Sequence, residues 1–292
     1  MEVTLGAGPS TSSGPSAAQP ITLTASGGAR AIVWPQGAQV ASWIPAGGSE
    51  RLFLSQHPSG GPGGLRGGVP VIFPQFGGFG PLPFHGFARG LVWDLVAAAS
   101  HPDDGRPHGP GDGEAMAEFA LRDNEATRTL WPHDFRATLS VHAGGPRLRV
   151  ALGVTNAGAQ PFSFTAALHT YIRVADLVQT TLEGLTGLTY LDHQNGDVVR
   201  TESEPRVGFS GPVDRIYYAV PGAIVVREPE RQLWIEATGF PDAVVWTPWN
   251  GAVKNLEPDG FRHFVCVEAA AVRTPITLPP GARWTGEQTL IA

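Results

Sequence analysis

One acidic residue stands out because its neighbours along the chain are almost all apolar. Glu268 lies in the segment FVCVEAAAV, where strand alternation places Phe264, Cys266 and Ala270 on its own face. Burying a carboxylate costs free energy unless it is paired, and burial raises its pKa toward the range of a general base at neutral pH. Glu268 is therefore predicted to be either a general base that takes a proton from a sugar hydroxyl or a structural carboxylate that caps backbone amides or pairs with an arginine.

A histidine on another predicted strand could supply the matching acid. In FSFTAALHTYIRV, alternation separates the apolar face of Phe162, Phe164 and Leu168 from a polar face that carries His169. The same polar face includes Thr165. Two interpretations remain open, an acid-base residue in a site or the solvent-facing side of an edge strand.

A third candidate region joins glycines, prolines and cationic side chains between residues 64 and 95. The segment GLRGGVPVIFPQFGGFG is followed closely by LPFHGFARGLVWDL, and its polar residues are Arg66, Gln75, His85 and Arg89. Glycine lets a backbone approach a ligand closely, and the planar arginine fork suits a phosphate or carboxylate. We expect these four residues to bind a polar, anionic ligand, unless they are features of a core turn.

Several other kinds of site find no support in the sequence. It contains no Cys/His cluster or H-E-x-x-H motif for zinc, no phosphate-binding loop and no G-x-S-x-G motif. No metal and no organic cofactor are therefore predicted. A pair of glycosidase carboxylates could be drawn from Asp192, Asp214 and Glu268, but no spacing singles out two of them.

The elements that must position these residues are predicted to be β-strands. RATLSVHA and RLRVALGVT alternate apolar and polar residues, and no window of 12 or more residues keeps a helical period. The absence of a fixed repeat disfavours a propeller. We predict an all-β fold, one large sandwich over residues 21–292, with further strands in ITLTAS, RAIVW, QVASWI, LVWDLVAA, AMAEFALR, AIVVRE, LWIEATGF, AVVWTPW, HFVCVEAAAV and WTGEQTLI.

Composition narrows the class of partner. The formal net charge is −6, which argues against a nucleic-acid surface, and no apolar run is long enough to span a membrane. The single cysteine cannot form an internal disulfide. We therefore expect a cytoplasmic monomer that binds a small molecule.

Two segments have compositions typical of flexible chain. Residues 1–20 are rich in Gly, Pro, Ser, Thr and Ala and are predicted to form a tail, with organelle import left open. Residues 101–113, HPDDGRPHGPGDG, are predicted to form an exposed loop.

Taken together, the ordered motifs resemble a known enzyme family. RGGVPVIFPQFG, LPFHGFARGLVWDL, ALHTYIRV, GLTYLDH, VDRIY, VVWTPW and VCVEAAAV occur in the order found in the glucose-6-phosphate 1-epimerase branch of the aldose 1-epimerase family. The resemblance covers roughly residues 22–290. It implies a galactose mutarotase-like β-supersandwich that interconverts the α and β anomers of an aldohexose 6-phosphate, most simply glucose 6-phosphate, without a cofactor.

The resemblance also implies roles for individual residues. Glu268 would act as the base at the C1 hydroxyl, and His169 would donate a proton to the ring oxygen. His85 and Asp214 would bind sugar hydroxyls. Arg66 and Arg89 would bind the 6-phosphate.

The sequence departs from the family pattern at two places. Thr247 stands where the family often has Asn, and the segment before Arg66 lacks a lysine that some members carry. Alternatives therefore remain: the same chemistry on unphosphorylated sugars, a non-catalytic carbohydrate-binding sandwich that uses Trp246, Trp249 and Phe87 as platforms, or a regulator without turnover.

Overall fold

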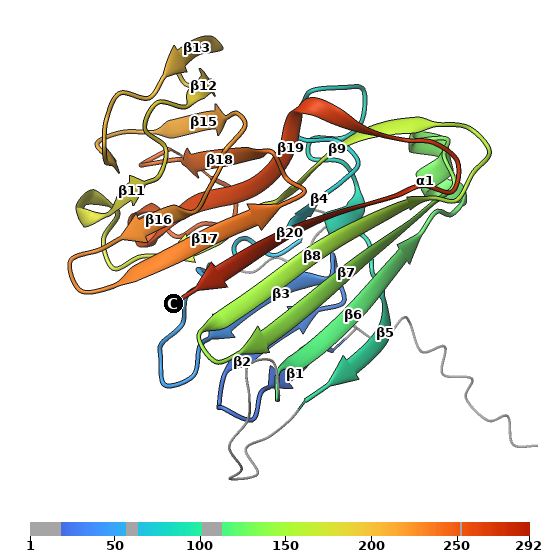
Figure 1. Ribbon diagram of the computed structural model, residues 1–292, viewed down its shortest axis with the longest axis horizontal. Coiled ribbons are helices and arrows are strands. Elements are labelled where there is room, and N and C mark those ends of the chain that lie inside the picture. The colour runs from blue at the N-terminus through green and yellow to red at the C-terminus, as the bar shows by residue number, and fades with distance from the viewer. Residues whose placement is uncertain (1–18, 57–63, 101–112, 252) are drawn as a thin grey trace, which may run out of the picture.

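The protein is built almost entirely from antiparallel β-strands (Figure 1). The computed structural model describes residues 19–56, 64–100, 113–251 and 253–292. Helical structure in these ranges amounts to a single α-helix and three 3-10 turns, α1 (Glu125–Leu130), η1 (Ala88–Gly90), η2 (Leu177–Gln179) and η3 (Gly260–His263). The prediction of an all-β fold is confirmed.

The first large sheet has eight strands. Its path follows the order β13 (Val198–Thr201), β12 (Thr189–Asp192), β15 (Val213–Tyr217), β18 (Asp242–Thr247), β19 (Phe264–Leu278), β9 (Phe162–Leu168) and β4 (Val71–Ile72), and β10 (Tyr171–Arg173) also pairs with β19.

The second large sheet has nine strands. Their order is β14 (Val207–Gly208), β11 (Thr181–Glu183), β16 (Ile224–Arg227), β17 (Gln232–Thr238), β20 (Arg283–Ile291), β8 (Arg147–Asn156), β7 (Phe135–Gly144), β6 (Ala115–Arg122) and β5 (Asp94–Ala99). A small third sheet contains β1 (Ile21–Thr24), β2 (Arg30–Trp34) and β3 (Gln39–Ile44).

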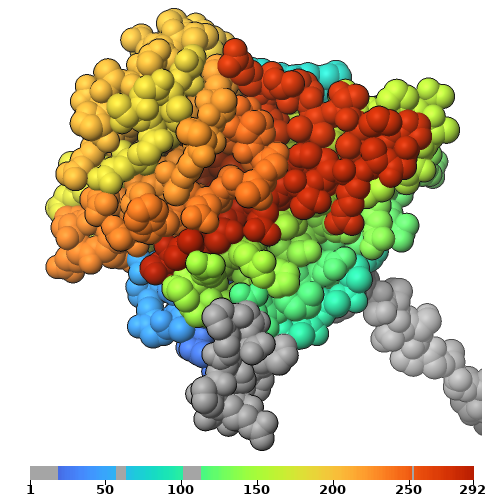
Figure 2. All heavy atoms as spheres, viewed as in Figure 1, coloured from blue at the N-terminus to red at the C-terminus, as the bar shows by residue number. Residues whose placement is uncertain are grey.

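One continuous apolar core joins the sheets. In β8 the alternate residues Leu148, Leu152 and Val154 are fully buried, and they share a cluster with Val265 and Val267 of β19. Fully burying such a side chain stabilises the fold by about 1.5–3 kcal/mol. The C-terminal strands link the two halves of the chain, and Figure 2 shows them as a continuous red band between its orange and green parts.

Strand β19 organises the middle of the eight-stranded sheet. Over 15 residues it pairs with β18 on one side and with β10 and then β9 on the other, and its register shifts between Ala271 and Ile276. The break between β9 and β10 falls at His169 and Thr170, beside Glu268, where the Val267 N–H donates to the Thr170 carbonyl at 3.1 Å. A local interruption of pairing thus places a histidine next to a carboxylate.

The predicted strands are confirmed, and several short strands were missed. Every strand segment named from alternation contains or overlaps an observed strand. Strands β4, β12 and β15 have two to five residues and were not predicted, because alternation over so few residues is a weak signal. The similarly short β1, β2 and β16 were predicted, and β10 was predicted as one strand with β9, which the structure interrupts at His169 and Thr170. Strands β4, β10, β12 and β15 carry or flank much of the site.

Two predicted flexible segments fall almost entirely outside the described residues. The tail predicted over residues 1–20 lies outside the described residues except for its last two, and the loop predicted over residues 101–113 lies outside them except for its last. In the ranges that are described, no helix has the length and apolar character needed to cross a membrane.

Candidate active site

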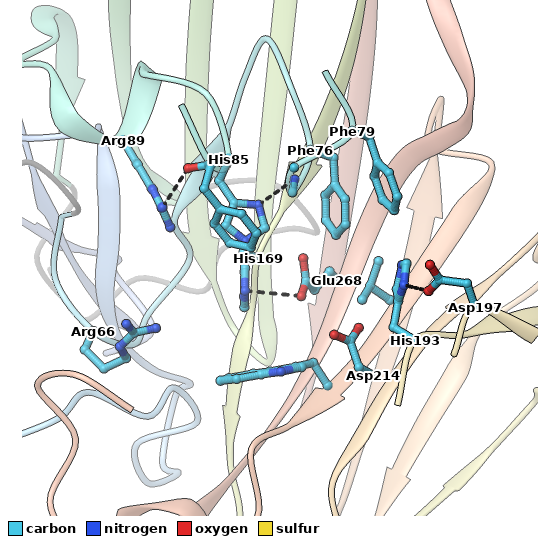
Figure 3. A pocket seen from close by; sticks show the side chains of 15 residues that line it. Arg66, Phe76, Phe79, His85, Arg89, His169, His193, Asp197, Asp214 and Glu268 are labelled. Atoms are coloured by element: carbon cyan, nitrogen blue, oxygen red, sulfur yellow. Dashed lines mark hydrogen bonds and ion pairs between the residues drawn. The ribbon is translucent and has the colours of Figure 1, made fainter. Parts of the chain in front are cut away.

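A cavity of about 550 Å³ opens at the eight-stranded sheet, and its size is that of a small-molecule site (Figure 3). Strands β15, β18 and β19, the loop after β4 and the turn after β12 all contribute to its wall. The lining residues are Arg66, Phe76, Gly77, Gly78, Phe79, Phe84, His85, Arg89, His169, His193, Asp197, Asp214, Val244, Trp246 and Glu268.

Glu268 is carried by β19 and lines the cavity. Its side chain is 1 % exposed, and its Oε1 lies 3.3 Å from Nε2 of His169. Its other oxygen, Oε2, is buried without a hydrogen-bond partner among the described residues. Burial, and secondarily the charge of Asp214, raises the pKa of Glu268 well above its ordinary value. One oxygen of this buried carboxylate therefore has no hydrogen bond to the rest of the described protein.

His169 lies in the break between β9 and β10. Its backbone N–H donates to the Pro70 carbonyl at 2.9 Å, and its ring stacks on Tyr171 with centroids 4.9 Å apart. Burial, followed by the nearby His85 and Arg89, lowers the pKa of His169 well below the ordinary value. The residue is only 8 % exposed, so the interpretation of a solvent-facing edge strand is wrong.

The two groups form a coupled acid-base pair. A raised pKa at Glu268 and a lowered pKa at His169 both favour the neutral forms, a carboxyl that carries a proton and an imidazole whose only ring proton is on Nδ1. Moving the carboxyl proton from Oε1 to Nε2 gives a carboxylate and an imidazolium without any exchange with solvent. The pair can therefore supply a base and an acid at the same time.

His85 is placed beside this pair by a strained turn. Its φ of 67° lies in the left-handed region, and its ring centroid is 5.6 Å from that of His169. Nδ1 of His85 accepts a hydrogen bond from the Gly77 N–H at 3.0 Å. Burial first, and then Arg89 and Arg66, lower the pKa of His85 to about 3. A neutral ring that accepts at Nδ1 carries its proton on Nε2, so His85 is a hydrogen-bond donor.

Arg66 and Arg89 make one end of the cavity cationic. Arg66 donates to the Tyr171 hydroxyl at 3.0 Å and to the Lys254 carbonyl at 3.3 Å. Arg89, in η1, donates to the Phe84 carbonyl at 3.1 Å. Each guanidinium has five N–H donors, so both retain donors for an anion.

Asp214 lies on another wall of the cavity. It faces Trp246 across the β15–β18 pair, and burial raises its pKa, with His193 opposing that shift. Figure 3 places Asp214, His193 and Asp197 on the side of Glu268 away from Arg66 and Arg89. The cavity thus has a cationic end and an acidic end with the Glu268–His169 pair between them.

One predicted ligand-binding residue does not reach the cavity wall. Gln75 is 4 % exposed, and its side-chain amide forms hydrogen bonds within its own loop. Its amide donates to the Gly77 and Leu82 carbonyls and its carbonyl accepts from the Leu82 N–H. The structure therefore corrects the expected role of Gln75: it shapes the loop, because no polar atom is left to contact a substrate.

The three aromatic residues predicted as sugar-stacking platforms lie in different parts of the structure. Trp246 lines the cavity, whereas Phe87 packs in the core and Trp249 lies against Phe261 with centroids 5.8 Å apart. A platform formed by all three is excluded because they do not share a surface.

Sequence reasoning missed the residues at the acidic end and at the mouth. His193 and Asp197 occupy the turn between β12 and β13, and Phe79 and Phe84 belong to the loop after β4. His193 ends the motif GLTYLDH, which contributed to the family resemblance, but the sequence assigned it no role. Among the described residues, no group of three or more His, Cys, Asp or Glu side chains is arranged to hold a metal ion.

Comparison with known proteins assigns the fold and the family. The aldose 1-epimerase family profile matches residues 19–290. A protein of Cenchrus ciliaris is 36% identical over 95% of this chain and 86% of its own, and an Escherichia coli K12 protein is 35% identical over 80% and 77%. Both carry the name "Putative glucose-6-phosphate 1-epimerase".

Solved structures agree with this assignment. The crystal structure of a "putative mutarotase" from Salmonella typhimurium aligns with a TM-score of 0.79 at 30% identity, covering 90% of this chain and 86% of that one. The aldose epimerase homologue from C. elegans aligns with a TM-score of 0.70 at 12% identity, over 94% and 98%, and shares the fold. The predicted galactose mutarotase-like sandwich is confirmed. The protein therefore belongs to the aldose 1-epimerase family, and it is an isomerase of the mutarotase class that interconverts sugar anomers.

Proposed function

We propose that this protein interconverts the α and β anomers of an aldohexose 6-phosphate, with glucose 6-phosphate as the first candidate. The observation that carries the proposal is one cavity in which a paired carboxylate and imidazole, 3.3 Å apart, lie next to two arginines. The pair suits ring opening, and the arginines suit a phosphate dianion.

Ring opening would begin at the C1 hydroxyl. The Glu268 carboxylate removes the proton from O1, the C1–O1 bond becomes a carbonyl, and the C1–O5 bond breaks. His169 gives its Nε2 proton to O5 as that bond breaks. The products are an open aldehyde, a protonated Glu268 and a neutral His169, so the proton count is unchanged.

Ring closure reverses these transfers. Rotation about the C1–C2 bond presents the other face of the aldehyde to O5. His169 then removes the O5 proton while Glu268 returns a proton to O1. His85, a neutral donor at Nε2, would hold a sugar oxygen without competing for the proton.

The acid-base assignment is tested by anomer exchange measured with NMR on glucose 6-phosphate. We expect Glu268→Gln and His169→Ala each to lower kcat on the order of 10²- to 10⁴-fold, since each removes one proton-transfer group. Glu236→Gln, an exposed carboxylate on β17, is the matched control and should behave as the wild type. Unchanged exchange in both site variants would remove the two residues from the mechanism.

The nearest alternative is the same chemistry on unphosphorylated sugars. The chain lacks the lysine before Arg66 that the resemblance led us to look for, so two arginines would have to bind the dianion. Arg89→Ala should lower kcat/KM for glucose 6-phosphate on the order of 10- to 100-fold, because it removes a charge-assisted hydrogen bond. The same variant should leave the turnover of glucose almost unchanged. If Arg89→Ala kept the wild-type kcat/KM for glucose 6-phosphate, that result would favour a reaction on unphosphorylated sugars.

A further inference from the structure

His193 is a cavity residue that the proposed reaction does not use. It follows β12, and its backbone N–H donates to the Asp214 carbonyl at 2.9 Å, which ties the turn to β15. Its Nδ1 is hydrogen-bonded to the Asp197 carboxylate. Its ring lies against Phe79, with centroids 5.3 Å apart. Three contacts therefore fix an imidazole at the cavity wall.

Its hydrogen bond to Asp197 leaves one ring atom for a ligand. A carboxylate at Nδ1 keeps the proton on that nitrogen, so the remaining polar atom is Nε2. The His193 side chain is 20 % exposed, whereas Asp197 is 67 % exposed. The carboxylate thus lies on the solvent side, and the imidazole is the group closer to the interior.

His193 lies at the end of the cavity opposite the two arginines. Figure 3 shows Arg66 and Arg89 on one side of the Glu268–His169 pair and His193 on the other. The charge interactions agree with this arrangement. The charges of both arginines lower the pKa of His169, whereas the charges that shift the pKa of Asp214 are those of His193, Asp192 and Asp197. The cavity therefore has a direction, from cationic end to His193.

A hexose 6-phosphate has a matching direction. Its phosphate is attached through C6 to C5, and the ring carbon directly across from C5 is C2. If the phosphate lies at the arginines and the C1–O5 edge lies at Glu268 and His169, the C2 hydroxyl points toward the far end of the cavity. His193 is the imidazole at that end.

We propose that His193 binds the C2 hydroxyl of the hexose through Nε2 and that Asp197 positions its ring. His193 then distinguishes substrates by the group at C2, and Asp197 acts through it. This inference rests on the proposed function, because the phosphate sets the orientation of the sugar.

The test compares glucose 6-phosphate with 2-deoxyglucose 6-phosphate by NMR exchange, with the buffer rate subtracted. The wild type should favour the 2-hydroxyl substrate about tenfold in kcat/KM, the value of one hydrogen bond. His193→Phe keeps the ring contact with Phe79 but has no polar atom, and it should reduce that preference to less than about twofold. His193→Gln, which restores a polar atom near the place of Nε2, should recover part of it.

Two further variants separate recognition from structure. Asp197→Asn should raise KM for glucose 6-phosphate more than for the deoxy analogue while kcat changes little. Gln194→Ala, an exposed neighbour in the same turn, should keep the wild-type preference. The proposal fails if the wild type has the same kcat/KM for glucose 6-phosphate and 2-deoxyglucose 6-phosphate. It also fails if His193→Phe lowers these two kcat/KM values by the same factor.

Failure of the proposed function would give a different result. In that case the wild type would accelerate exchange of glucose but not of glucose 6-phosphate. The contact of His193 would then be tested by comparing kcat/KM for glucose and 2-deoxyglucose. If His193→Phe lowered kcat/KM for both sugars by the same factor, the proposed contact would again be overturned.

Discussion

Burial has the largest effect on the pKa values of Glu268, His169 and His85. Glu268 and His169 have ordinary pKa values on either side of pH 5, but burial raises the first and lowers the second. Arg66 and Arg89 further lower the pKa values of His169 and His85, because a positive charge nearby disfavours an imidazolium. The same arginines that suit a phosphate therefore help to keep His85 a neutral donor.

This shift at His85 predicts a pH dependence of stability. Because its pKa is lowered to about 3 in the folded protein, the unfolded chain binds more protons between pH 6.5 and 3, and stability falls as the pH falls through that range. The loss from this one group is at most about 1.4 kcal/mol per pH unit. His85→Asn should reduce the slope, and denaturant unfolding at pH 6.5 and 4.5 measures it.

Asparagine is chosen because it keeps the local structure. It tolerates the positive φ of 67°, and its side-chain oxygen can accept the Gly77 N–H as Nδ1 does. Parallel stability curves for the wild type and His85→Asn would contradict the assignment of a neutral His85.

Among the elements, the loop after β4 and strand β19 do most to position the site. The loop places His85 through a bridge between Phe73 and Gly86, and the Phe87 N–H donates to the Phe73 carbonyl at 3.1 Å. Strand β19 carries Glu268 and pairs with β10, which brings Tyr171 beside Cys266. Backbone pairing, rather than contacts among the polar side chains, sets most of the geometry.

Gly86 offers a test of that loop. Its φ is +68°, and a Cβ at this position would lie 2.3 Å from the Phe73 carbonyl oxygen. Gly86→Ala should therefore lower the free energy of unfolding by about 1–3 kcal/mol and raise KM, because the adjacent His85 must move. Denaturant unfolding and NMR exchange kinetics measure the two effects.

Gly208 supplies the matched control. A Cβ there would meet nothing within 4 Å, and its φ lies outside the left-handed region. Gly208→Ala should leave KM unchanged. If Gly86→Ala were equally harmless, the close approach of the loop to Phe73 would not be what holds His85.

Across the whole molecule, the cationic end of the cavity contrasts with the net charge. The chain carries −6 overall, and its cavity nevertheless contains Arg66 and Arg89. A localised positive site on a negative protein binds an anion through short-range contacts, with the rest of the molecule opposing the approach of a dianion.

Salt should therefore affect the two candidate sugars differently. Raising the ionic strength from about 0.05 to 0.5 M shortens the screening length several-fold, so KM for glucose 6-phosphate should change while KM for glucose stays constant. Arg89→Ala should show a smaller salt response on the phosphate substrate. Identical responses of both sugars would argue against a phosphate at the arginines.

Local patterns in the sequence were sufficient for the fold class, and the ordered motifs were sufficient for the family. Alternation of period two predicted the long strands of the second sheet, because each residue of a strand reports its own burial. The apolar surroundings of Glu268 identified it as a buried carboxylate, and the ordered motifs identified the family. Its pairing with His169 was implied by the resemblance, and the structure places the two side chains in contact.

Tertiary structure alone decided which polar residues share the cavity. Gln75 and Arg66 look equally suited to a ligand in the sequence, but the Gln75 amide is used by its own loop. His193 ends the motif GLTYLDH but had no role assigned from the sequence, and the structure shows that its turn lies against β15 and Phe79 and faces the cavity. The physical reason is that a strand pattern reports which face is buried, whereas a site depends on pairings between segments far apart in the chain, and short strands and turns make those pairings without a local pattern.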